Sequence, residues 1–230
     1  MKTKLKILNL YAGIGGNRKS WGNSHDITAI EIDPKIAKIY KDFFPNDKVI
    51  VKDAHKYLLK HFKEFDFIWS SPPCPTHSRV RKNCAMNRID IALPKAKFPD
   101  MKLYEEILFL EGYFKGKYCI ENVVSWYKPL IVPQERQRHY FWANFYIDQI
   151  KLDPDHICGG SIDFFQKNFG FDLSKYKSIN KKLALTNCVN YELGEHILNC
   201  ALKGAKQQIF EALRGYVRPQ NYQADLLPTL

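Results

Sequence analysis

Short apolar runs alternate with stretches of helical periodicity through the first half of the chain. The apolar runs have the length of strands and cover residues 4–11, 28–33, 48–53, 65–69 and 117–120. Between them, residues 34–44 and 101–114 repeat apolar side chains at helical spacing, and residues 57–62 form a shorter helical pattern. This alternation predicts an α/β fold in which a parallel sheet is covered by helices on both faces. In the helix at 101–114 the residues expected to face inward are Leu103, Ile107, Leu108, Leu110, Tyr113 and Phe114.

The predicted strands end in residues that can bind a ligand. The first strand leads into the glycine-rich turn 12–17, the second ends at Glu31 and Asp33, and the third ends at Asp53. Carboxyl ends of parallel strands share one edge of the sheet, and ligands of open α/β folds bind there. Glu31 follows the first glycine by about 18 residues, the spacing at which a carboxylate reaches ribose hydroxyls in nucleoside-binding units. The full Gly-x-Gly-x-x-Gly pattern of dinucleotide binders is absent, and the acid suits an adenosyl ligand in general.

A cysteine follows the fourth predicted strand. Cys74 comes directly after Pro72 and Pro73, which cannot donate to a sheet ladder and therefore end the strand. A thiol at this edge is either a nucleophile or an ordinary buried side chain. The fifth strand delivers Glu121 to the same edge. A carboxylate beside the thiol favours the first interpretation, in which Cys74 and Glu121 form a catalytic pair.

A polar alternation follows in residues 133–142. Gln134, Arg136 and Arg138 are spaced so that they share one face of a single strand. One amide and two guanidinium groups on one face can grip a base or a phosphate. The alternative is a surface strand whose arginines have no ligand.

The charge balance points to a polyanionic partner. Lys and Arg number 35 against 24 Asp and Glu, which gives a formal net charge of +11. Nucleic acid is the first expectation, and the alternative is a chain that is merely rich in lysine. A basic segment at 79–99 directly follows Cys74, and its residues Arg79, Arg81 and Lys82 are candidate nucleic-acid contacts. A solvated loop with incidental charge is the competing interpretation.

The spacing of the cysteines and the hydropathy of the chain indicate which cellular compartment to expect. The chain has six cysteines, and no pair has Cys-x-x-Cys spacing, so neither a metal site nor a disulfide framework is expected. Neither a signal peptide nor an apolar run long enough to span a membrane is recognisable. The expectation is a cytoplasmic protein without a membrane partner.

Taken together, these motifs resemble those of the DNA cytosine-5 methyltransferase family, in the family's order and over most of the chain. The segment Tyr11-Ala12-Gly13-Ile14-Gly15-Gly16 resembles its S-adenosylmethionine loop, and Pro72-Pro73-Cys74 its nucleophile motif. Glu121-Asn122-Val123 is similar to its Glu-Asn-Val motif, and Gln134-x-Arg136-x-Arg138 to its Gln-x-Arg-x-Arg motif. Asn187-Cys188-Val189 resembles its Asn-Ser-Val motif, whose helix packs back beside the first strand.

The resemblance implies a Rossmann-like sheet of the S-adenosylmethionine-dependent methyltransferases and methyl transfer to carbon 5 of cytosine in DNA, with S-adenosylhomocysteine as product and no metal. The implied cofactor-binding residues are Tyr11, Gly13, Ile14, Gly15, Gly16, Glu31, Ile32, Asp53 and Asn187. The implied catalytic residues are Cys74, Glu121, Arg136, Arg138 and Pro73. The implied DNA contacts are Arg79, Arg81, Lys82 and Gln134.

The resemblance also suggests a role for each catalytic group. The Cys74 thiolate, favoured by Arg138 or Arg79, would add to carbon 6 of a flipped cytosine. Glu121 would hold ring nitrogen 3, and the Pro73 carbonyl would accept from the exocyclic amine. Arg138 would bond the base carbonyl, and Arg136 would brace Cys74 or a phosphate.

The chain departs from the family pattern in two regions. Pro75 and the segment 76–78 replace the residues that usually follow the nucleophile, and only residues 146–186 stand where the family inserts a large target-recognition domain. We therefore expect a catalytic core at 1–145, a short recognition region at 146–186 whose aromatic residues mostly dock it on the core, and a segment at 187–230 that returns to the core. The basic loop 79–88 is expected to carry more of the DNA contact than usual.

Several alternatives stay open on the sequence. Ser71-Pro72-Pro73 also resembles the motif of amino-methyltransferases, although Cys74 and Glu121 argue against that reaction. The same core serves transfer-RNA cytosine-5 methyltransferases. The short recognition region also fits the catalytic subunit of a split methyltransferase that needs a recognition partner. A cognate restriction nuclease is a further possible partner, and a prokaryotic or phage origin is expected.

Overall fold

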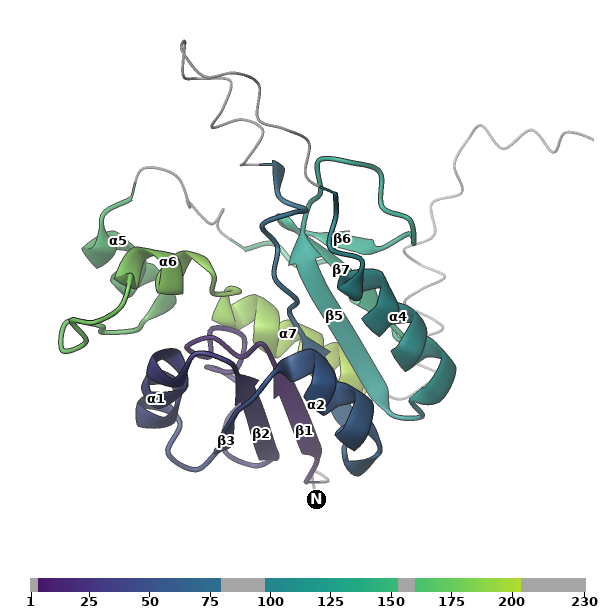
Figure 1. Ribbon diagram of the computed structural model, residues 1–230, viewed down its shortest axis with the longest axis horizontal. Coiled ribbons are helices and arrows are strands. Elements are labelled where there is room, and N and C mark those ends of the chain that lie inside the picture. Colours follow the sequence, from purple (N-terminus) through teal and green to yellow (C-terminus); the bar gives the residue numbers. More distant parts are fainter. Residues whose placement is uncertain (1–3, 80–97, 153–159, 204–230) are drawn as a thin grey trace, which may run out of the picture.

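A computed structural model describes residues 4–79, 98–152 and 160–203, and its centre is a seven-stranded sheet with the order β3-β2-β1-β4-β5-β7-β6 (Figure 1). The strands are β1 (Lys6–Leu10), β2 (Asp26–Glu31), β3 (Lys48–Val51), β4 (Phe67–Ser70), β5 (Lys117–Val123), β6 (Gln134–Arg136) and β7 (His139–Ala143). Strands β1 to β5 pair in parallel, and β7 is antiparallel to both of its neighbours. The predicted α/β fold, with a parallel sheet built from the first five strands, is confirmed.

Within the described residues, seven helical elements connect or cover the strands. They are α1 (Pro34–Phe43), α2 (Ala54–His61), the 3-10 helix η1 (Phe62–Glu64), α4 (Lys102–Tyr113), α5 (Ile162–Phe169), α6 (Lys181–Thr186) and α7 (Tyr191–Leu202). The acids after β2 and β3 begin the next helices, because Asp33 caps α1 and Asp53 caps α2 through their side chains. Helix α2 therefore begins three residues before the helical pattern predicted at 57–62. In the described part of the chain no helix has the length and apolar character needed to cross a membrane.

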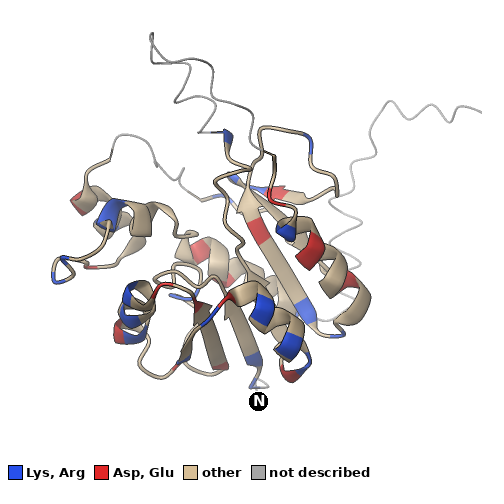
Figure 2. Cartoon of the chain, viewed as in Figure 1, with Lys and Arg blue, Asp and Glu red and all other residues tan. Residues whose placement is uncertain are grey.

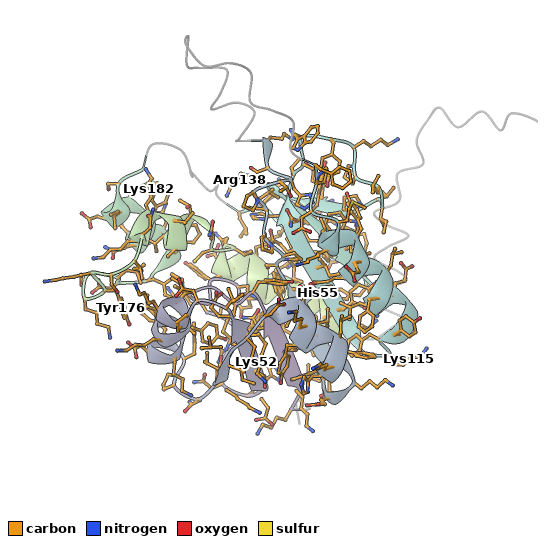
Figure 3. The ribbon with its side chains drawn as sticks, viewed as in Figure 1. Lys52, His55, Lys115, Arg138, Tyr176 and Lys182 are labelled. Carbon is orange, nitrogen blue, oxygen red and sulfur yellow. The ribbon has the colours of Figure 1, made fainter. Side chains whose placement is uncertain are left out.

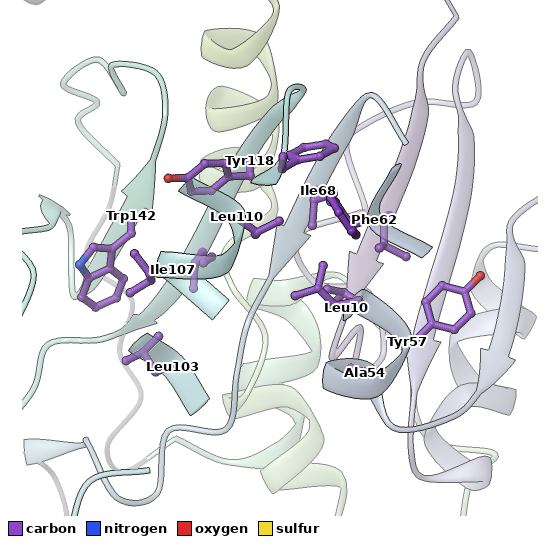
Figure 4. Close-up of a cluster of buried hydrophobic side chains, with 14 of the residues drawn as sticks. Leu10, Ala54, Tyr57, Phe62, Ile68, Leu103, Ile107, Leu110, Tyr118 and Trp142 are labelled. Atoms are coloured by element: carbon purple, nitrogen blue, oxygen red, sulfur yellow. The ribbon is translucent and has the colours of Figure 1, made fainter. Parts of the chain in front are cut away.

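Side chains that alternate along the strands build a core on each face of the sheet. Leu8, Leu10, Ile68 and Ile120 point toward α2 and α4, in the cluster drawn in Figure 4. Ile7, Phe67, Trp69 and Cys119 point to the opposite face, where they pack against α7. Helices on both faces were predicted, and α7 is seen crossing behind the strands in Figure 1. Because successive side chains of a strand point to opposite faces, a continuous apolar run serves both cores.

Two side chains of α4 that were predicted to face the core are exposed to solvent. Leu108 is 61% exposed and Tyr113 is 67% exposed, whereas Leu103, Ile107 and Leu110 are buried. The inward stripe of α4 follows the spacing 103, 107 and 110, and each helical residue turns about 100° from the last. Leu108 therefore faces solvent although it is apolar, and the prediction for these two residues was wrong.

Residues 133–142 form a hairpin and not one strand. Strand β6 ends at Arg136, the chain reverses at Gln137 with φ of 56°, and β7 starts at His139. Arg138 therefore lies in the turn and does not share a strand face with Gln134 and Arg136. Alternating polar residues are compatible with one long strand or two short ones, so the pattern alone could not locate the reversal.

The region between β7 and α7 packs against the first third of the chain. Phe165, Phe169 and Phe171 are buried together with Ile14 and Ile39. Tyr176, labelled in Figure 3, donates to Asp42 of α1 at 2.7 Å. The expectation that most aromatic residues of 146–186 dock this region on the core is thus confirmed for the three buried phenylalanines. Helix α7 lies beneath β1 and β4, the position that the family resemblance implied for it.

Candidate active site

The carboxyl ends of the first strands frame a cleft of about 190 Å³. Its walls come from the turn after β1, the ends of β2 and β3, the start of α2, the two prolines after β4, and the start of α4. The lining residues are Tyr11, Glu31, Ile32, Asp53, Ala54, His55, Pro72, Pro73, His77, Asp100, Lys102 and Leu103. Four of the predicted cofactor-binding residues, Tyr11, Glu31, Ile32 and Asp53, therefore meet in one cleft.

Backbone groups fix the two acids in this cleft. The Glu31 carboxylate accepts from the amide of Gly13 at 2.9 Å and from the amide of Asp33 at 3.0 Å. Asp53 accepts from the amide of Lys56 at 3.0 Å, and this bond lowers the pKa of its carboxyl group. A carboxylate has about four acceptor positions, so each can still accept from a ligand hydroxyl.

The same cleft offers an apolar surface beside those acceptors. The Ile32 side chain is 66% exposed, an unusual state for a large apolar residue directly after a buried strand. Hydroxyl acceptors next to an apolar wall fit the ribose and the base of a nucleoside. The residues present therefore fit an adenosyl cofactor.

The other predicted cofactor residues lie outside the cleft wall. Ile14 is buried among side chains of α1 and α5, and Asn187 is exposed at the end of α6. A Cβ atom on Gly16 would stand 2.6 Å from Cys188 Cβ, so this glycine permits close packing of the first turn against residues 188–189. For Ile14, Gly15, Gly16 and Asn187 a role in binding the cofactor stays a prediction.

A buried carboxylate beneath the cleft was not predicted. Glu106 of α4 has no exposed surface, and its oxygens accept from Tyr11 Oη at 2.6 Å and from Ser70 Oγ at 2.6 Å. His55 Nδ1 lies 3.1 Å from the same carboxylate, and this hydrogen bond raises the pKa of His55. The signal in the sequence was a charged residue within the apolar stripe of α4. Glu106 thus ties the end of β1, the end of β4 and the start of α2 together, and Figure 3 shows His55 on α2.

Cys74 lies half-buried after the diproline and is protonated at neutral pH. Burial first, and then the negative charge of Glu121, raise the pKa of the Cys74 thiol to about 11. The prediction that Arg138 or Arg79 favours the thiolate is therefore wrong for this structure. Arg79 directs Nε to the backbone oxygen of Ser125, at 3.1 Å. The effect of Glu121 on the thiol shows that these two predicted catalytic residues lie within electrostatic reach of each other.

Two residues at the end of β5, Asn122 and Glu121, interact with the segment that contains Pro72 and Cys74. Asn122 donates from Nδ2 to the Pro72 carbonyl at 3.0 Å, which fixes the diproline to β5. Glu121 is buried, and its Oε1 lies 2.6 Å from Nδ1 of His139 on β7. Neither Asn122 nor His139 was assigned a role from the sequence. Because β7 pairs with β5, the hairpin brings His139 to the Glu121 carboxylate.

Arg136 and Gln134 have backbone partners in the segment after β7. The buried Arg136 guanidinium donates to the carbonyls of Ile147 and Asp148. The Gln134 side chain donates to Phe145 O at 2.8 Å and accepts from Ile147 N at 2.8 Å. The expected bracing of Cys74 by Arg136 is not what these contacts show. Both side chains instead attach β6 to residues 145–148, and a DNA contact for Gln134 stays a prediction.

The unusual residues after Cys74 are anchored to the loop after β5. His77 is buried, with Nδ1 2.6 Å from Tyr127 Oη. Trp126 donates its amide to His77 O at 3.0 Å and its indole nitrogen to Thr76 O at 2.9 Å. These bonds give the nucleophile loop a rigid support. Arg81 and Lys82 lie outside the described residues.

Among the described residues, no cluster of three or more His, Cys, Asp or Glu side chains could hold a metal ion.

Residues 5–93 match the profile of a protein family described as C-5 cytosine-specific DNA methylase. A C-5 cytosine methyltransferase domain is therefore present in this part of the chain, and it contains the cleft acids and Cys74.

Relatives with assigned names match less than half of the chain. The chain is similar to tRNA (cytosine(38)-C(5))-methyltransferase of Homo sapiens, with 29% identity over 118 residues, or 45% of this chain. The rat enzyme of the same name is 30% identical over 118 residues. The alignment spans only 30% of either relative's length. A solved structure of DNMT2 from Spodoptera frugiperda is 25% identical, with a TM-score of 0.35, over 51% of this chain and 35% of that one.

Proposed function

We propose that this chain transfers a methyl group from S-adenosylmethionine to carbon 5 of cytosine in DNA, through a covalent adduct with Cys74. The observation that carries the proposal is that Cys74, directly after the diproline that lines the cleft, and the buried Glu121 lie at the same end of the paired strands β4 and β5. The domain found at residues 5–93 supports the same chemistry.

Glu31, Asp53, Ile32 and Tyr11 are the residues that would hold the cofactor. Glu31 and Asp53 would accept from ribose hydroxyls or base nitrogens, and Ile32 would cover the adenine face. The bound sulfonium supplies an electrophilic methyl group. Pro72 and Pro73 line the same cleft, so the cofactor would lie next to the nucleophile loop.

Cys74 would make carbon 5 nucleophilic. Carbon 5 of cytosine is a poor nucleophile, and addition of a thiolate to carbon 6 gives it enamine character. Because the pKa of the Cys74 thiol is about 11 in the free protein, the thiol must lose its proton when the substrate binds. Carbon 6 is inaccessible within a duplex, so the base would be flipped out at a cost of roughly a few kcal/mol.

The remaining groups would bind the edge of the flipped base. Glu121 would hold ring nitrogen 3, the Pro73 carbonyl would accept from the exocyclic amine, and Arg138 would bond the base carbonyl. Arg138 lies in the β6–β7 turn at this end of the sheet (Figure 3), which supports its assignment. Arg136 is no longer proposed to brace Cys74, because its donors are directed at residues 147–148.

The test is transfer of labelled methyl groups from S-adenosylmethionine to mixed-sequence DNA by the purified chain. Wild type is expected to label cytosine, and Cys74→Ala is expected to give no label above background. Glu121→Gln should reduce the rate far more than the affinity for DNA, since its bond matters most in the transition state. Undiminished labelling by Cys74→Ala would contradict the mechanism, and mass spectrometry of the nucleosides would separate carbon-5 from amino methylation.

Transfer RNA is the second candidate substrate. The relatives of known name are tRNA (cytosine(38)-C(5))-methyltransferases, and this observation favours RNA. The same assay with total transfer RNA in place of DNA discriminates between the two. If only a mixture of this chain with a second polypeptide is active, the chain is the catalytic subunit of a split enzyme. The short region 146–186 is the feature that favours that arrangement.

A further inference from the structure

His139 and Glu121 form an isolated buried ion-pairing unit at the end of β5. Nδ1 of His139 lies 2.6 Å from Oε1 of Glu121, and each side chain is 8% exposed. The other ring nitrogen of His139, Nε2, is buried without a hydrogen-bond partner among the described residues. A buried ring nitrogen without a hydrogen-bond partner lowers the stability of the fold and needs an explanation. The explanation we consider is the bond that the other ring nitrogen makes to the Glu121 carboxylate.

The groups next to this pair are two thiols, an aromatic ring and Arg138. Burial and the charge of Glu121 raise the pKa of both Cys74 and Cys119, so neither thiol contributes a negative charge at neutral pH. The Phe141 ring lies with its centroid 6.1 Å from that of His139, and Arg138 precedes His139 in the turn. Glu121 is the negative group in contact with His139. A second proton on the pair would neutralise it, and it would also remove the charge that opposes a thiolate at Cys74.

We infer that His139 is a positioning residue that holds a proton for Glu121, so that Glu121 can deliver it to ring nitrogen 3 of the bound cytosine. This inference rests on the proposed function. It gives the hairpin β6–β7 a part in the reaction, because β7 carries His139 to the carboxylate. The sequence showed the carboxylate as a candidate and gave no sign of its partner.

The proton balance of the reaction closes with these groups and solvent. The Cys74 thiol gives its proton to solvent as the substrate binds, its sulfur forms a bond to carbon 6, and the electron pair of the carbon 5–carbon 6 double bond shifts through carbon 4 to nitrogen 3. Nitrogen 3 takes the proton from the Glu121 carboxyl, and the His139 N–H then stabilises the carboxylate that remains. Once carbon 5 carries the methyl group, nitrogen 3 returns its proton to Glu121, carbon 5 loses its hydrogen to solvent as a proton, and the sulfur leaves carbon 6 with the electron pair of its bond.

The decisive variant is His139→Asn, which keeps an N–H donor near the position of Nδ1 but cannot carry a proton. At pH 7.5 we expect the single-turnover rate of methyl transfer to fall about 100-fold, within the usual range for acid catalysis, with little change in DNA affinity. The deficit should shrink to about tenfold or less at pH 5.5, because Glu121 can then take a proton from solvent. A loss of equal size at every pH, or no loss, would overturn the inference.

The chain offers a matched control. His61 and Glu64 form a pair of the same kind, with Nδ1 2.7 Å from Oε1, on the outer side of α2 and away from the cleft. His61→Asn removes an equivalent hydrogen bond and should leave both the rate and its pH profile unchanged. Thermal unfolding of both variants shows whether either loses its fold.

A second measurement separates this inference from the proposed function. Proton NMR of the free protein detects the Nδ1–H of His139 without any methyl transfer, as the downfield resonance of a short bond to a carboxylate. In Glu121→Gln that resonance should move upfield, because the acceptor loses its charge, and an unchanged resonance would refute the pair. If the resonance moves but wild type methylates neither DNA nor transfer RNA, the proposed function fails while the pair stands.

Discussion

The surroundings of Cys74 hold its thiol in the protonated state. Two causes act together, burial and the charge of Glu121, while Arg79 and Arg136 donate to backbone carbonyls. A resting thiol protects the free protein from oxidation and alkylation, since the thiolate is the reactive form. Under the proposed mechanism the same residue must become a thiolate, which would couple substrate binding to the activation of Cys74.

The reactivity of Cys74 toward iodoacetamide tests this state. With a pKa of about 11, the rate should be about 100-fold below that of an unperturbed thiol at pH 7.5. It should rise about tenfold per pH unit and level off only near pH 11, as peptide mapping at Cys74 would show. Glu121→Gln removes one cause of the shift and should speed the reaction at fixed pH. A plateau below pH 9 would contradict the assignment.

Glu106 is the second residue whose chemistry is set by its surroundings. It accepts from Tyr11 and Ser70 and pairs with His55, and Glu106→Gln would turn an acceptor oxygen into a donor nitrogen. We expect a loss of about 2–3 kcal/mol in the free energy of unfolding, measured by urea denaturation, because a buried donor loses its partner. Glu105→Gln is the control, since Glu105 is largely exposed and lies 3.5 Å from His55.

Glu106 should also affect how the free energy of unfolding depends on pH. The raised pKa of His55 means that its contribution is fully present below about pH 6.5, its unfolded value, and is lost as pH rises through the folded value. Glu106→Gln should flatten this part of the stability profile. A profile unchanged from wild type would show that Glu106 does not hold the His55 proton.

At the scale of elements, α7 closes the fold against the first turn of the chain. Trp21 donates from Nε1 to Gly194 O at 3.0 Å, and the side chains of α7 fill the core beneath β1 and β4. Lys19 adds a bond to Phe169 O at 2.8 Å, so the first turn also holds the region that precedes α7. The cofactor turn is therefore supported from below by the last helix described.

A pair of glycine variants tests that support. A Cβ atom on Gly194 would stand 2.8 Å from Asn17 Cα and against the Asn17 carbonyl, so Gly194→Ala must push α7 from the first turn. We expect a loss of about 1–3 kcal/mol in the free energy of unfolding. Gly112→Ala on α4 meets no atom within 4 Å and should instead stabilise by a few tenths to about 1 kcal/mol. Similar changes in the free energy of unfolding of both variants would contradict the close contact between Gly194 and Asn17.

Most helices and strands could be predicted from the sequence. The division of residues 133–142 into the two paired strands β6 and β7 could not. Strands β1 to β5 and helices α1 and α4 carry periods that local physics imposes on them. The hairpin at β6 and β7 depends on Gln137 adopting a positive φ, which no preference of glutamine indicates. That reversal separates Arg138 from Arg136, and it places His139 beside Glu121.

For the whole molecule, the net charge of +11 is spread over several surfaces. Figure 2 shows Lys and Arg on α1, on α2 and around α5 and α6, so no one of the described elements carries all of them. Arg79 is the described arginine or lysine that follows Cys74 most closely in the chain. A polyanion that reached Cys74 would pass near Arg79, so we expect Arg79 to contribute to binding more than the remote lysines do.

The salt dependence of DNA binding tests this contribution. Replacing Arg79 and Arg81 by alanine should weaken binding and reduce the slope of log affinity against log salt by roughly 1 to 2. Fluorescence anisotropy between low and moderate salt provides the slope. Lys115→Ala is the control, because Lys115 lies just before β5, at the opposite edge of the sheet (Figure 3). An unchanged slope in the arginine variant would refute the assignment.

The sequence by itself determined the sheet, the helices on both faces, the edge at which the ligand residues gather, and the order of Cys74 and Glu121 along the chain. These follow from local periodicity and from the rule that parallel strands end at one edge. Only the tertiary structure decided the partners of each group: Glu106 beneath the cleft, Asn122 on the diproline, Arg136 on residues 147–148 and His139 on Glu121. These contacts join residues that are distant in sequence, and their burial sets the protonation state of Cys74, which no pattern along the chain encodes.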